Sequence, residues 1–357
     1  MDISKIIDIK KLLFLSGRPL IKTTHKPKIG VGVDIGGFSV KLVELNYDKQ
    51  NVPTLVNAGV FRIPAESKSA SKDALKSLLD NLHIGTTDVN ISLSGPSVIV
   101  RYIQMPLMSE EELKSAIKFE AEKYIPFNIN DVIIDNKLLS SLHEDKKMRV
   151  LLVAAKKDLI DSRILMLQEV GLTPKTIDID SFCIINSFLY SNPNIDKEKN
   201  VAILDIGSAF SEINIIRGQE PYFTRSIQIA GKDITNAISE NLKMDITKAY
   251  DMKHDYSQNE DEVFEAMKPV LFELVSEIRL SFSYYENQFG RGVEEVYVTG
   301  GTAKFPKLVV FLSENLGVKT QRWDPLGCFN MAPSLDKSKL DDIRDQMAVS
   351  VGLALRK

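Results

Sequence analysis

The chain has 357 residues, a length at which a single hydrophobic core usually gives way to two or more lobes. Its 45 basic and 48 acidic residues nearly cancel, so no overall field points to nucleic acid or to an acidic substrate. Two distant cysteines and four scattered histidines argue against a disulfide framework and a zinc site, while magnesium with oxygen ligands stays open. Because no window of about 18 apolar residues could span a membrane, we expect a soluble protein of a reducing compartment.

Residues 1–28 are expected to form an amphipathic extension. Several apolar side chains share one side of a helical wheel, with lysines near the other: Ile3, Ile6, Ile7, Leu13 and Phe14. Charges interrupt this apolar side and no small-residue cleavage site follows, so the segment is not a convincing signal peptide. Two interpretations stay open, namely a helix on a membrane surface or a partner, and a helix packed on its own domain.

Three strands are expected between Lys28 and Pro64: IGVGVDI, SVKLVEL and, after Pro53, LVNAGVFRI. The first two meet at Gly36-Gly37, where we expect a tight reversal with positive φ angles. Two glycines in a row leave backbone N–H groups uncovered by side chains, and such groups form a nest for anions. This turn is therefore a candidate phosphate site.

A separate module is expected from Pro106 to about Asp178. Its first helix begins after Ser109, where Glu112 completes a capping box, and it stops before Pro126. A strand pair around the loop HEDKK, a helix and a strand (LTPKTIDI) follow. This mixed order predicts a small α+β insertion.

The sequence then repeats itself after about 170 residues, which implies two similar lobes. DIGGFSVKLVEL at 34–45 and DIGSAFSEINII at 205–216 both place Asp-Ile-Gly at the end of a buried strand and resume with an alternating one. A long helix is expected at 261–288, and a strand then leads into a third glycine turn at Gly300-Gly301. The chain ends in an amphipathic helix that we expect in the second lobe.

Three turns of this kind can bind a polyphosphate if two of them face each other across a cleft. Their amides would then act together with three hydroxyl groups, those of Ser39, Ser208 and Ser211. Lys41 is placed for a β- or γ-phosphate, and the third turn lets the backbone approach a nucleoside. Asp34 and Asp205 could hold Mg²⁺ through water, since this ion keeps several waters and usually takes one or two carboxylates plus phosphates.

The simpler interpretation of any one turn is a hairpin glycine with nothing bound. An aspartate at the end of a strand is costly unless it has a partner, however, so its duplication favours a functional site.

This arrangement resembles the actin-like ATPase superfamily, in which two related lobes clamp ATP and magnesium. The phosphate motifs of the superfamily match 34–41 and 205–211, and its adenosine motif matches 298–303. The resemblance implies an α/β fold, the actin-like or ribonuclease-H-like two-lobed ATPase fold, and Asp205 as a residue able to orient water. Cofactor contacts are implied for twelve residues: Asp34, Gly36, Gly37, Ser39, Lys41, Asp205, Gly207, Ser208, Ser211, Lys253, Gly300 and Gly301. The sequence departs from the pattern at Tyr250. Members of the superfamily often carry a Glu at this position, three residues before the lysine that corresponds to Lys253.

Within the superfamily the chain is similar to the PilM family of type IV pilus assembly proteins. The similarity rests on GVDIGGFSVKLVEL, MPLMSEEELKSAIKFEAEKYIPF, LDIGSAFSEINI, SEIRLSFSYYENQF, VTGGTAKFPKL and VSVGLALR. It implies a first lobe of 29–105 and 179–199 and an insertion of 106–178, as in PilM-like and FtsA-like proteins. The second lobe would be 200–357, with a helical part at about 232–290.

The resemblance also implies a function: an ATP-binding cytoplasmic adaptor, peripheral to the inner membrane, that links the pilus alignment complex to the assembly motors. Such a protein receives the cytoplasmic tail of a PilN-like inner-membrane protein in a groove between the insertion and the rest of the first lobe. Candidates for that surface are Tyr124, Ile125 and Phe127, which could equally be ordinary core. Membrane association would come through the partner or through residues 1–28, and a homo-oligomer stays open.

Two other classes of protein share the implied fold. A sugar kinase would need a carboxylate base near a polar substrate loop, where the first lobe offers SGPSVIVRYIQMP. The alternative is an FtsA-like, membrane-tethered and filament-forming division or cytoskeletal protein, with residues 1–28 as the tether. No unmistakable base stands out in the sequence, so we expect ATP hydrolysis to be slow or absent.

Overall fold

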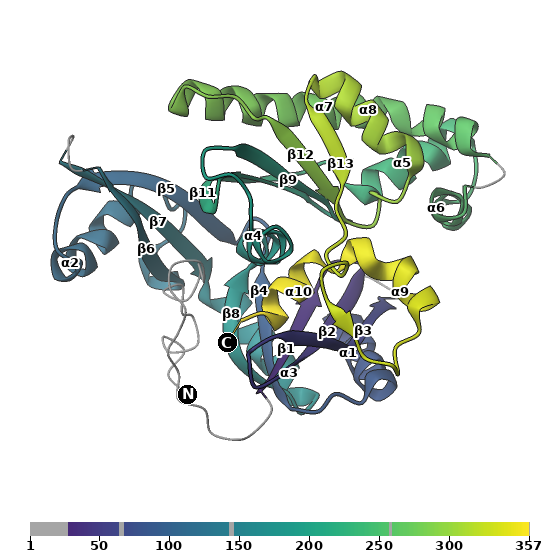
Figure 1. Ribbon diagram of the computed structural model, residues 1–357, viewed down its shortest axis with the longest axis horizontal. Helices are drawn as coiled ribbons and strands as arrows, with labels where there is room; N and C mark the ends of the chain where they lie inside the picture. Colours follow the sequence, from purple (N-terminus) through teal and green to yellow (C-terminus); the bar gives the residue numbers. More distant parts are fainter. Residues whose placement is uncertain (1–27, 64–67, 143–145, 257–258, 357) are drawn as a thin grey trace.

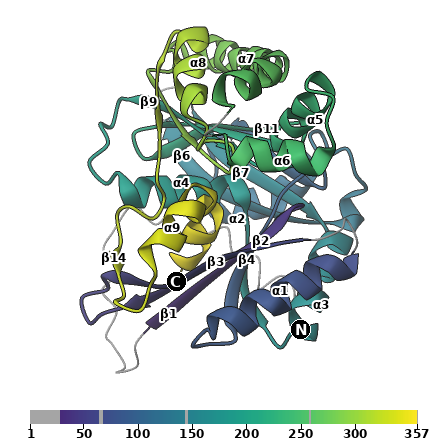
Figure 2. The same cartoon turned by 90° about the vertical axis from the view of Figure 1, so that its right-hand side faces the viewer.

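The computed structural model describes residues 28–356 except 64–67, 143–145 and 257–258. Its three β-sheets form two stacked lobes with an insertion at one side (Figures 1 and 2). The predicted amphipathic extension lies, but for Lys28, outside the described residues. No helix among the residues that are described is long and apolar enough to cross a membrane.

The first lobe contains a six-stranded sheet in the order β14-β3-β2-β1-β4-β8. The three strands expected before Pro64 are confirmed as an antiparallel run. Helices α1 and α3 contact this sheet, and α4 lies between it and the second lobe (Figure 1). The elements are β1 (Lys28–Ile35), β2 (Ser39–Tyr47), β3 (Pro53–Arg62), α1 (Lys68–Leu82), β4 (Asp88–Leu93), α3 (Lys157–Glu169), β8 (Thr173–Ile179), α4 (Asp180–Ser191) and β14 (Asn330–Met331).

The second lobe contains a five-stranded sheet in the order β11-β10-β9-β12-β13. The long helix expected at 261–288 is confirmed as α7, which packs its apolar side against this lobe's core. The elements are β9 (Asn200–Ile206), β10 (Ser211–Arg217), β11 (Glu220–Ile227), α5 (Gly231–Asn241), α6 (Ile246–His254), α7 (Glu260–Phe289), β12 (Glu295–Thr299), α8 (Pro306–Leu316) and β13 (Lys319–Arg322).

The internal repeat predicted from the sequence is visible in the two sheets. Across each sheet, the central strand (β1 or β9) has an antiparallel pair of strands on one side and two strands parallel to it on the other. The order β3-β2-β1-β4-β8 therefore matches β11-β10-β9-β12-β13. The hairpins also match in register, because Asp34 pairs with Lys41 and Asp205 pairs with Glu212. The two Asp-Ile-Gly motifs therefore occupy equivalent places in the two lobes.

The insertion has different boundaries from the predicted 106–178. Its three-stranded sheet is β5-β7-β6, and the predicted capping box at Ser109 is confirmed at the start of α2. Strand β8 pairs with β4 of the first lobe instead, and α3 buries Ile160 and Leu167 in the first-lobe core. The insertion thus runs from about Val98 to Lys156. Its elements are β5 (Val98–Pro106), α2 (Glu110–Ala121), η3 (Ile129–Asp131), β6 (Val132–Leu142) and β7 (Lys147–Lys156).

The last part of the chain belongs to the first lobe and not, as predicted, to the second. After β13 the chain returns to pair β14 with β3, and α10 packs on β1 and α4. A Cβ atom at Gly32 would lie 2.1 Å from the Ser350 carbonyl oxygen, so only glycine allows α10 to approach β1 so closely. Arg356 and Asp178 form a buried ion pair at 2.8 Å. The remaining elements are α9 (Lys337–Ile343), η4 (Arg344–Gln346) and α10 (Ala348–Ala354).

Candidate functional site

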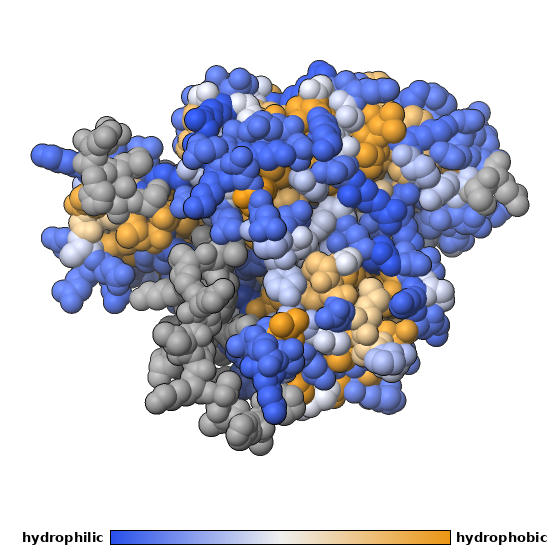
Figure 3. All heavy atoms as spheres, viewed as in Figure 1, coloured by the Kyte–Doolittle hydropathy of each residue, from blue (hydrophilic) through white to orange (hydrophobic). Residues whose placement is uncertain are grey.

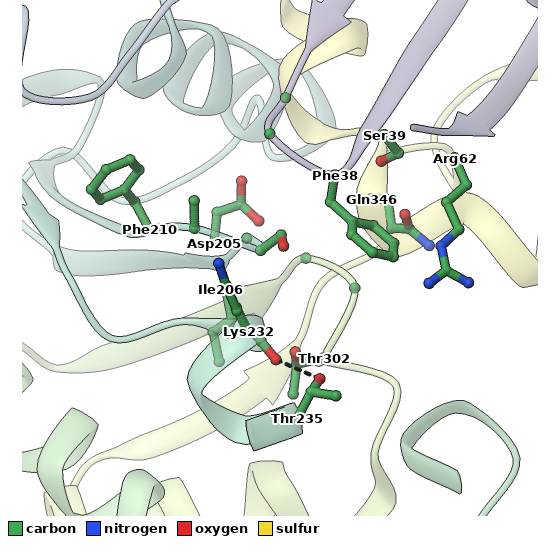
Figure 4. A pocket seen from close by; sticks show the side chains of 18 of the residues that line it. Phe38, Ser39, Arg62, Asp205, Ile206, Phe210, Lys232, Thr235, Thr302 and Gln346 are labelled. Carbon is green, nitrogen blue, oxygen red and sulfur yellow. Dashed lines mark hydrogen bonds between the residues drawn. The ribbon is translucent and has the colours of Figure 1, made fainter. Parts of the chain in front are cut away.

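A cavity of about 660 Å³ lies between the two lobes, where three strands end. The β1–β2 hairpin borders it from the first lobe, and the β9–β10 hairpin and the turn after β12 border it from the second. Figure 4 shows Asp205 and Phe210 on one side of this space, with Phe38 and Arg62 on the other. The three glycine turns predicted from the sequence therefore line a single cavity.

In the first hairpin, a lysine and a carboxylate pair across the two strands. Lys41 Nζ donates to Asp34 Oδ2 at 2.8 Å, and both side chains are largely shielded from solvent. Burial lowers the pKa of Lys41, but the charges of Asp34, Asp205 and Asp180 outweigh this effect, and the pKa is raised overall. Lys41 is therefore held in its charged form among several carboxyl groups.

In the second hairpin, two carboxyl groups occupy the equivalent positions. Glu212 is the cross-strand partner of Asp205, and burial raises the pKa of each to about 7. The Ser181 hydroxyl donates to Glu212 Oε2 at 3.1 Å, and the Ser226 hydroxyl donates to Oε1. Glu212 is thus fixed by both oxygens at the wall of the cavity.

Asp180 adds a carboxyl group that the sequence analysis missed. It is the first residue of α4, directly after β8, and it lines the same cavity. Burial, and after it the charge of Asp34, raise the pKa of Asp180 to about 6. A signal was present in TIDIDSF, where an aspartate stands at the end of a buried strand much as Asp34 and Asp205 do.

The inner end of the cavity is therefore rich in oxygen ligands. The charges of Asp34, Asp205 and Asp180 act on the ammonium group of Lys41. Glu212 lines the same cavity. In the part of the chain that is described, no three Asp, Glu, His or Cys side chains lie close enough together to hold a metal ion by themselves. Mg²⁺ usually takes one or two carboxylates and completes its shell with water and phosphate oxygens. This donor set fits that requirement.

Close packing explains some of the glycines of the turns, although not Gly37. A Cβ atom at Gly207 would lie 2.7 Å from the Phe210 carbonyl oxygen. At Gly300 it would lie 2.5 Å from Asp205 Oδ1, and φ there is +96°, which favours glycine. The positive φ angles predicted at Gly36 and Gly37 are not found. Gly36 instead allows a close approach, because a Cβ atom there would lie 3.1 Å from the Ser39 carbonyl oxygen. The Gly36 N–H donates to the same oxygen.

Eleven of the twelve predicted cofactor residues line the cavity, and Ser211 does not. Ser211 is buried, and its hydroxyl donates to the Ile229 carbonyl oxygen at 2.7 Å. It neighbours Glu212 on β10, and successive strand residues point to opposite sides of a sheet. Lys253 lines the cavity, but its ammonium group donates to Gly231 O and to Thr235 Oγ1 at 2.9 and 2.8 Å. Burial lowers the pKa of Lys253 to about 8.

The outer end of the cavity is lined by a second group of residues that the sequence analysis did not assign to the site. They are Phe38 and Arg62 from the first lobe, and Tyr250 and His254 from α6 of the second. The four residues come from separate turns, strand ends and a helix, so no local motif marks them as one group.

The three residues predicted to bind a partner differ in exposure. Ile125 is buried in the core of the insertion, whereas the side chain of Tyr124 is 37% exposed. Phe127 is half-buried, with Lys156 Nζ 4.4 Å from its ring centroid. Figure 3 shows apolar side chains on the insertion, at the left of the view. Its exposed large apolar residues are Leu107, Phe119, Tyr124 and Leu138.

The two repeated lobes and the cavity between them define an actin-like ATPase fold, as predicted. The chain belongs to the type IV pilus assembly protein PilM family, whose profile matches residues 32–357. This confirms the family to which the sequence motifs pointed.

Individual proteins are also similar to this chain. A solved PilM-PilN type IV pilus biogenesis complex contains a chain similar to this one, with 29% identity, a TM-score of 0.81, and coverage of 92% of this chain and 98% of that chain. The ethanolamine utilization protein EutJ from Carboxydothermus hydrogenoformans shares the fold at 14% identity and a TM-score of 0.58, with coverage of 98% and 95%. The cell division protein FtsA of Streptococcus pneumoniae serotype 2 (strain D39 / NCTC 7466) is 22% identical over 82% of this chain and 75% of its own length.

Proposed function

We propose that this protein is an ATP-binding adaptor of the type IV pilus assembly machinery. It would receive the cytoplasmic tail of a PilN-like inner-membrane protein and link the alignment complex to the assembly motors from the cytoplasmic side. The observation that carries the nucleotide part is the pair of equivalent Asp-Ile-Gly hairpins on one cavity of about 660 Å³. Membership of the PilM family supports the pilus part.

Electrostatics supports a nucleotide that enters with its cation. A triphosphate alone would meet the carboxyl groups at the inner end of the cavity, and like charges at short range repel. Mg²⁺ near Asp34 and Asp205, held through water, would separate the two sets of negative charge. Lys41 pairs with Asp34, is attracted by Asp205 and would contribute a direct contact to a phosphate. Backbone N–H groups of the glycine turns would add further donors.

Nucleotide would act on the angle between the lobes. A ligand that contacts both hairpins favours whichever closure satisfies both sets of contacts, so its binding shifts the population toward that arrangement. Asp205 could also orient a water near the terminal phosphate. The sequence offers no unmistakable general base, so we expect slow turnover or none.

The partner would bind the insertion side of the first lobe. A relative of 29% identity has been solved in a PilM-PilN complex, which supports a PilN-like tail as the ligand. An extended peptide gains affinity from backbone pairing and from pockets for alternate side chains. Tyr124 and the other exposed apolar residues of the insertion are available for such contacts, whereas Ile125 acts as core.

The test is a pull-down and calorimetric titration of the full chain with a synthetic peptide of the PilN-like tail, with and without Mg-ATP. We expect binding by the wild-type chain and weaker binding by Tyr124→Ala. A matched control is Leu165→Ala, since Leu165 is an exposed apolar residue of α3 outside the insertion. Absence of peptide binding in both conditions would contradict the adaptor function, and a separate Mg-ATP titration tests the nucleotide site.

A further inference from the structure

Three side chains at the outer end of the cavity connect the two lobes. The ring centroids of Phe38 and Tyr250 lie 5.0 Å apart. The Arg62 guanidinium carbon lies 4.3 Å from the centroid of Tyr250 and 4.8 Å from that of Phe38. Phe38 and Arg62 belong to the first lobe and Tyr250 belongs to α6 of the second. The two contacts of Tyr250 therefore cross the cleft, whereas the Arg62–Phe38 contact lies within the first lobe. We name this group of three residues the aromatic clasp.

The aromatic clasp lies where the cavity meets solvent. Arg62 is exposed and the rings of Phe38 and Tyr250 are half-buried, yet all three line the cavity. Asp34 and Lys41, at the inner end, are largely shielded from solvent. The cavity therefore has an inner acidic end and an outer end that is bridged by the clasp.

The ring of Tyr250 is already occupied by protein contacts. Besides Phe38 and Arg62, the ring of His254 lies 4.2 Å away from it, one helical turn further along α6. Three groups within 5.0 Å of the centroid leave little ring surface on which a nucleobase could stack. Tyr250 is therefore better suited to bridge the lobes than to bind a base.

We propose that the aromatic clasp controls the release of nucleotide from the cavity, by holding the two lobes together across its outer end. This inference rests on the proposed nucleotide site and adds the residues that govern exchange. Opening the cleft separates Tyr250 from Phe38 and Arg62, so their attraction adds to the barrier for release. Loss of an aromatic pair or a cation–π contact of this kind is expected to raise the rate of nucleotide release by about tenfold.

The experiment measures the dissociation of the fluorescent analogue mant-ATP, bound with Mg²⁺ to the full chain, after mixing with excess unlabelled Mg-ATP. Tyr250→Ala and Arg62→Ala should each release the probe about tenfold faster than the wild-type chain. Tyr250→Phe keeps the ring and should release it as slowly as the wild-type chain. Thermal unfolding of each variant checks that the fold is retained. The two alanine substitutions lie on different lobes, so a folding defect caused by one would not invalidate the measurement on the other.

A double variant separates a shared contact from two independent effects. If Arg62 and Tyr250 act through one clasp, the double alanine variant should release mant-ATP no faster than Tyr250→Ala alone. The clasp would be overturned if the fold-increases in release rate of the two single variants multiplied in the double variant, or if the alanine variants released mant-ATP as slowly as the wild-type chain. Either result would leave the nucleotide site intact. A wild-type chain that does not bind mant-ATP would overturn the proposed nucleotide site and the clasp together.

Discussion

The two hairpins that border the cavity have the same backbone plan and opposite electrostatic character. In the first, Asp34 forms an ion pair with its cross-strand partner Lys41, whereas in the second Asp205 faces Glu212. The backbone pairing and the Asp-Ile-Gly motif are common to both copies. The repeat therefore fixes where the two turns lie, and a single side chain at the opposing position decides the charge that each turn presents.

The difference makes the two copies complementary. Lys41 is also attracted by Asp205 and Asp180, so the first hairpin supplies positive charge to acids of the second lobe and of α4. The carboxyl groups of Asp205 and Glu212 have pKa values of about 7, which marks them as groups whose ionisation is penalised by burial. A site of this kind is incomplete without both lobes.

The largest effect is expected from removing the lysine. Lys41→Met takes away the positive charge between the aspartates and the direct phosphate contact, so we expect Mg-ATP affinity to fall on the order of 100-fold. Isothermal titration of the full chain measures this change. Lys72→Met is the control, because Lys72 forms an exposed ion pair with Glu169 on the first lobe, outside the cavity. An affinity within about threefold of wild type would contradict the role given to Lys41.

Neutralising the two equivalent aspartates should shift stability in opposite directions. The pKa of Asp205 is raised in the folded state, so its burial cost grows as pH rises from about 4 to 7 and is complete above that range. Asp205→Asn should therefore stabilise the nucleotide-free chain at pH 8, on the order of 1 kcal/mol, and change little at pH 4. Asp34→Asn should destabilise it at pH 8 by about 2 kcal/mol, because Lys41 loses its partner.

Thermal unfolding midpoints of the two variants, measured at pH 8 and at acid pH, check this contrast. Mg-ATP titration should show that Asp205→Asn, although more stable, binds the nucleotide more weakly, and Asp205→Ala should abolish retention with the fold intact. Shifts of the same sign for both asparagine variants would show that the hairpins are electrostatically equivalent after all.

A smaller effect is expected from the glycines. Gly207→Ala would place its Cβ atom 2.7 Å from the Phe210 carbonyl oxygen, and clashes of this kind cost about 1–3 kcal/mol. Gly37→Ala meets nothing nearer than the Ala209 side chain at 3.8 Å, so its unfolding midpoint should stay close to that of the wild-type chain. Equal losses in both variants would mean that the second turn is not the more tightly packed of the two.

The local elements and the repeat could be predicted from the sequence, because each depends on a short pattern. The capping box at Ser109 and the long helix α7 are examples, and both are confirmed. The boundary of the insertion could not be predicted in this way. Strand β8 pairs with β4 of the first lobe, which lies far upstream of β8 in the sequence. The return of the C-terminal helix to the first lobe depends likewise on pairings between distant segments.

The candidate site also has a part that could be predicted from the sequence and a part that could not. Its turns follow from glycines and aspartates at strand ends, and those residues meet as predicted, with the exception of Ser211. Asp180 comes from α4, and the aromatic clasp comes from the β1–β2 turn, the end of β3 and α6. Only the packing of the lobes brings these residues to one cavity. Sequence patterns report which face of an element is buried, and they do not report which elements converge.

The packing of α10 on the first lobe has a consequence for synthesis. The Tyr47 hydroxyl donates to the Ala354 carbonyl oxygen at 3.1 Å, across 307 residues of chain. A ribosome releases β1 and β2 long before α10, so the nascent sheet waits without the helix that covers it. Premature stops shortly before residue 348 should therefore leave this half of the protein exposed to chaperones and proteases, although all six strands of its sheet have been made.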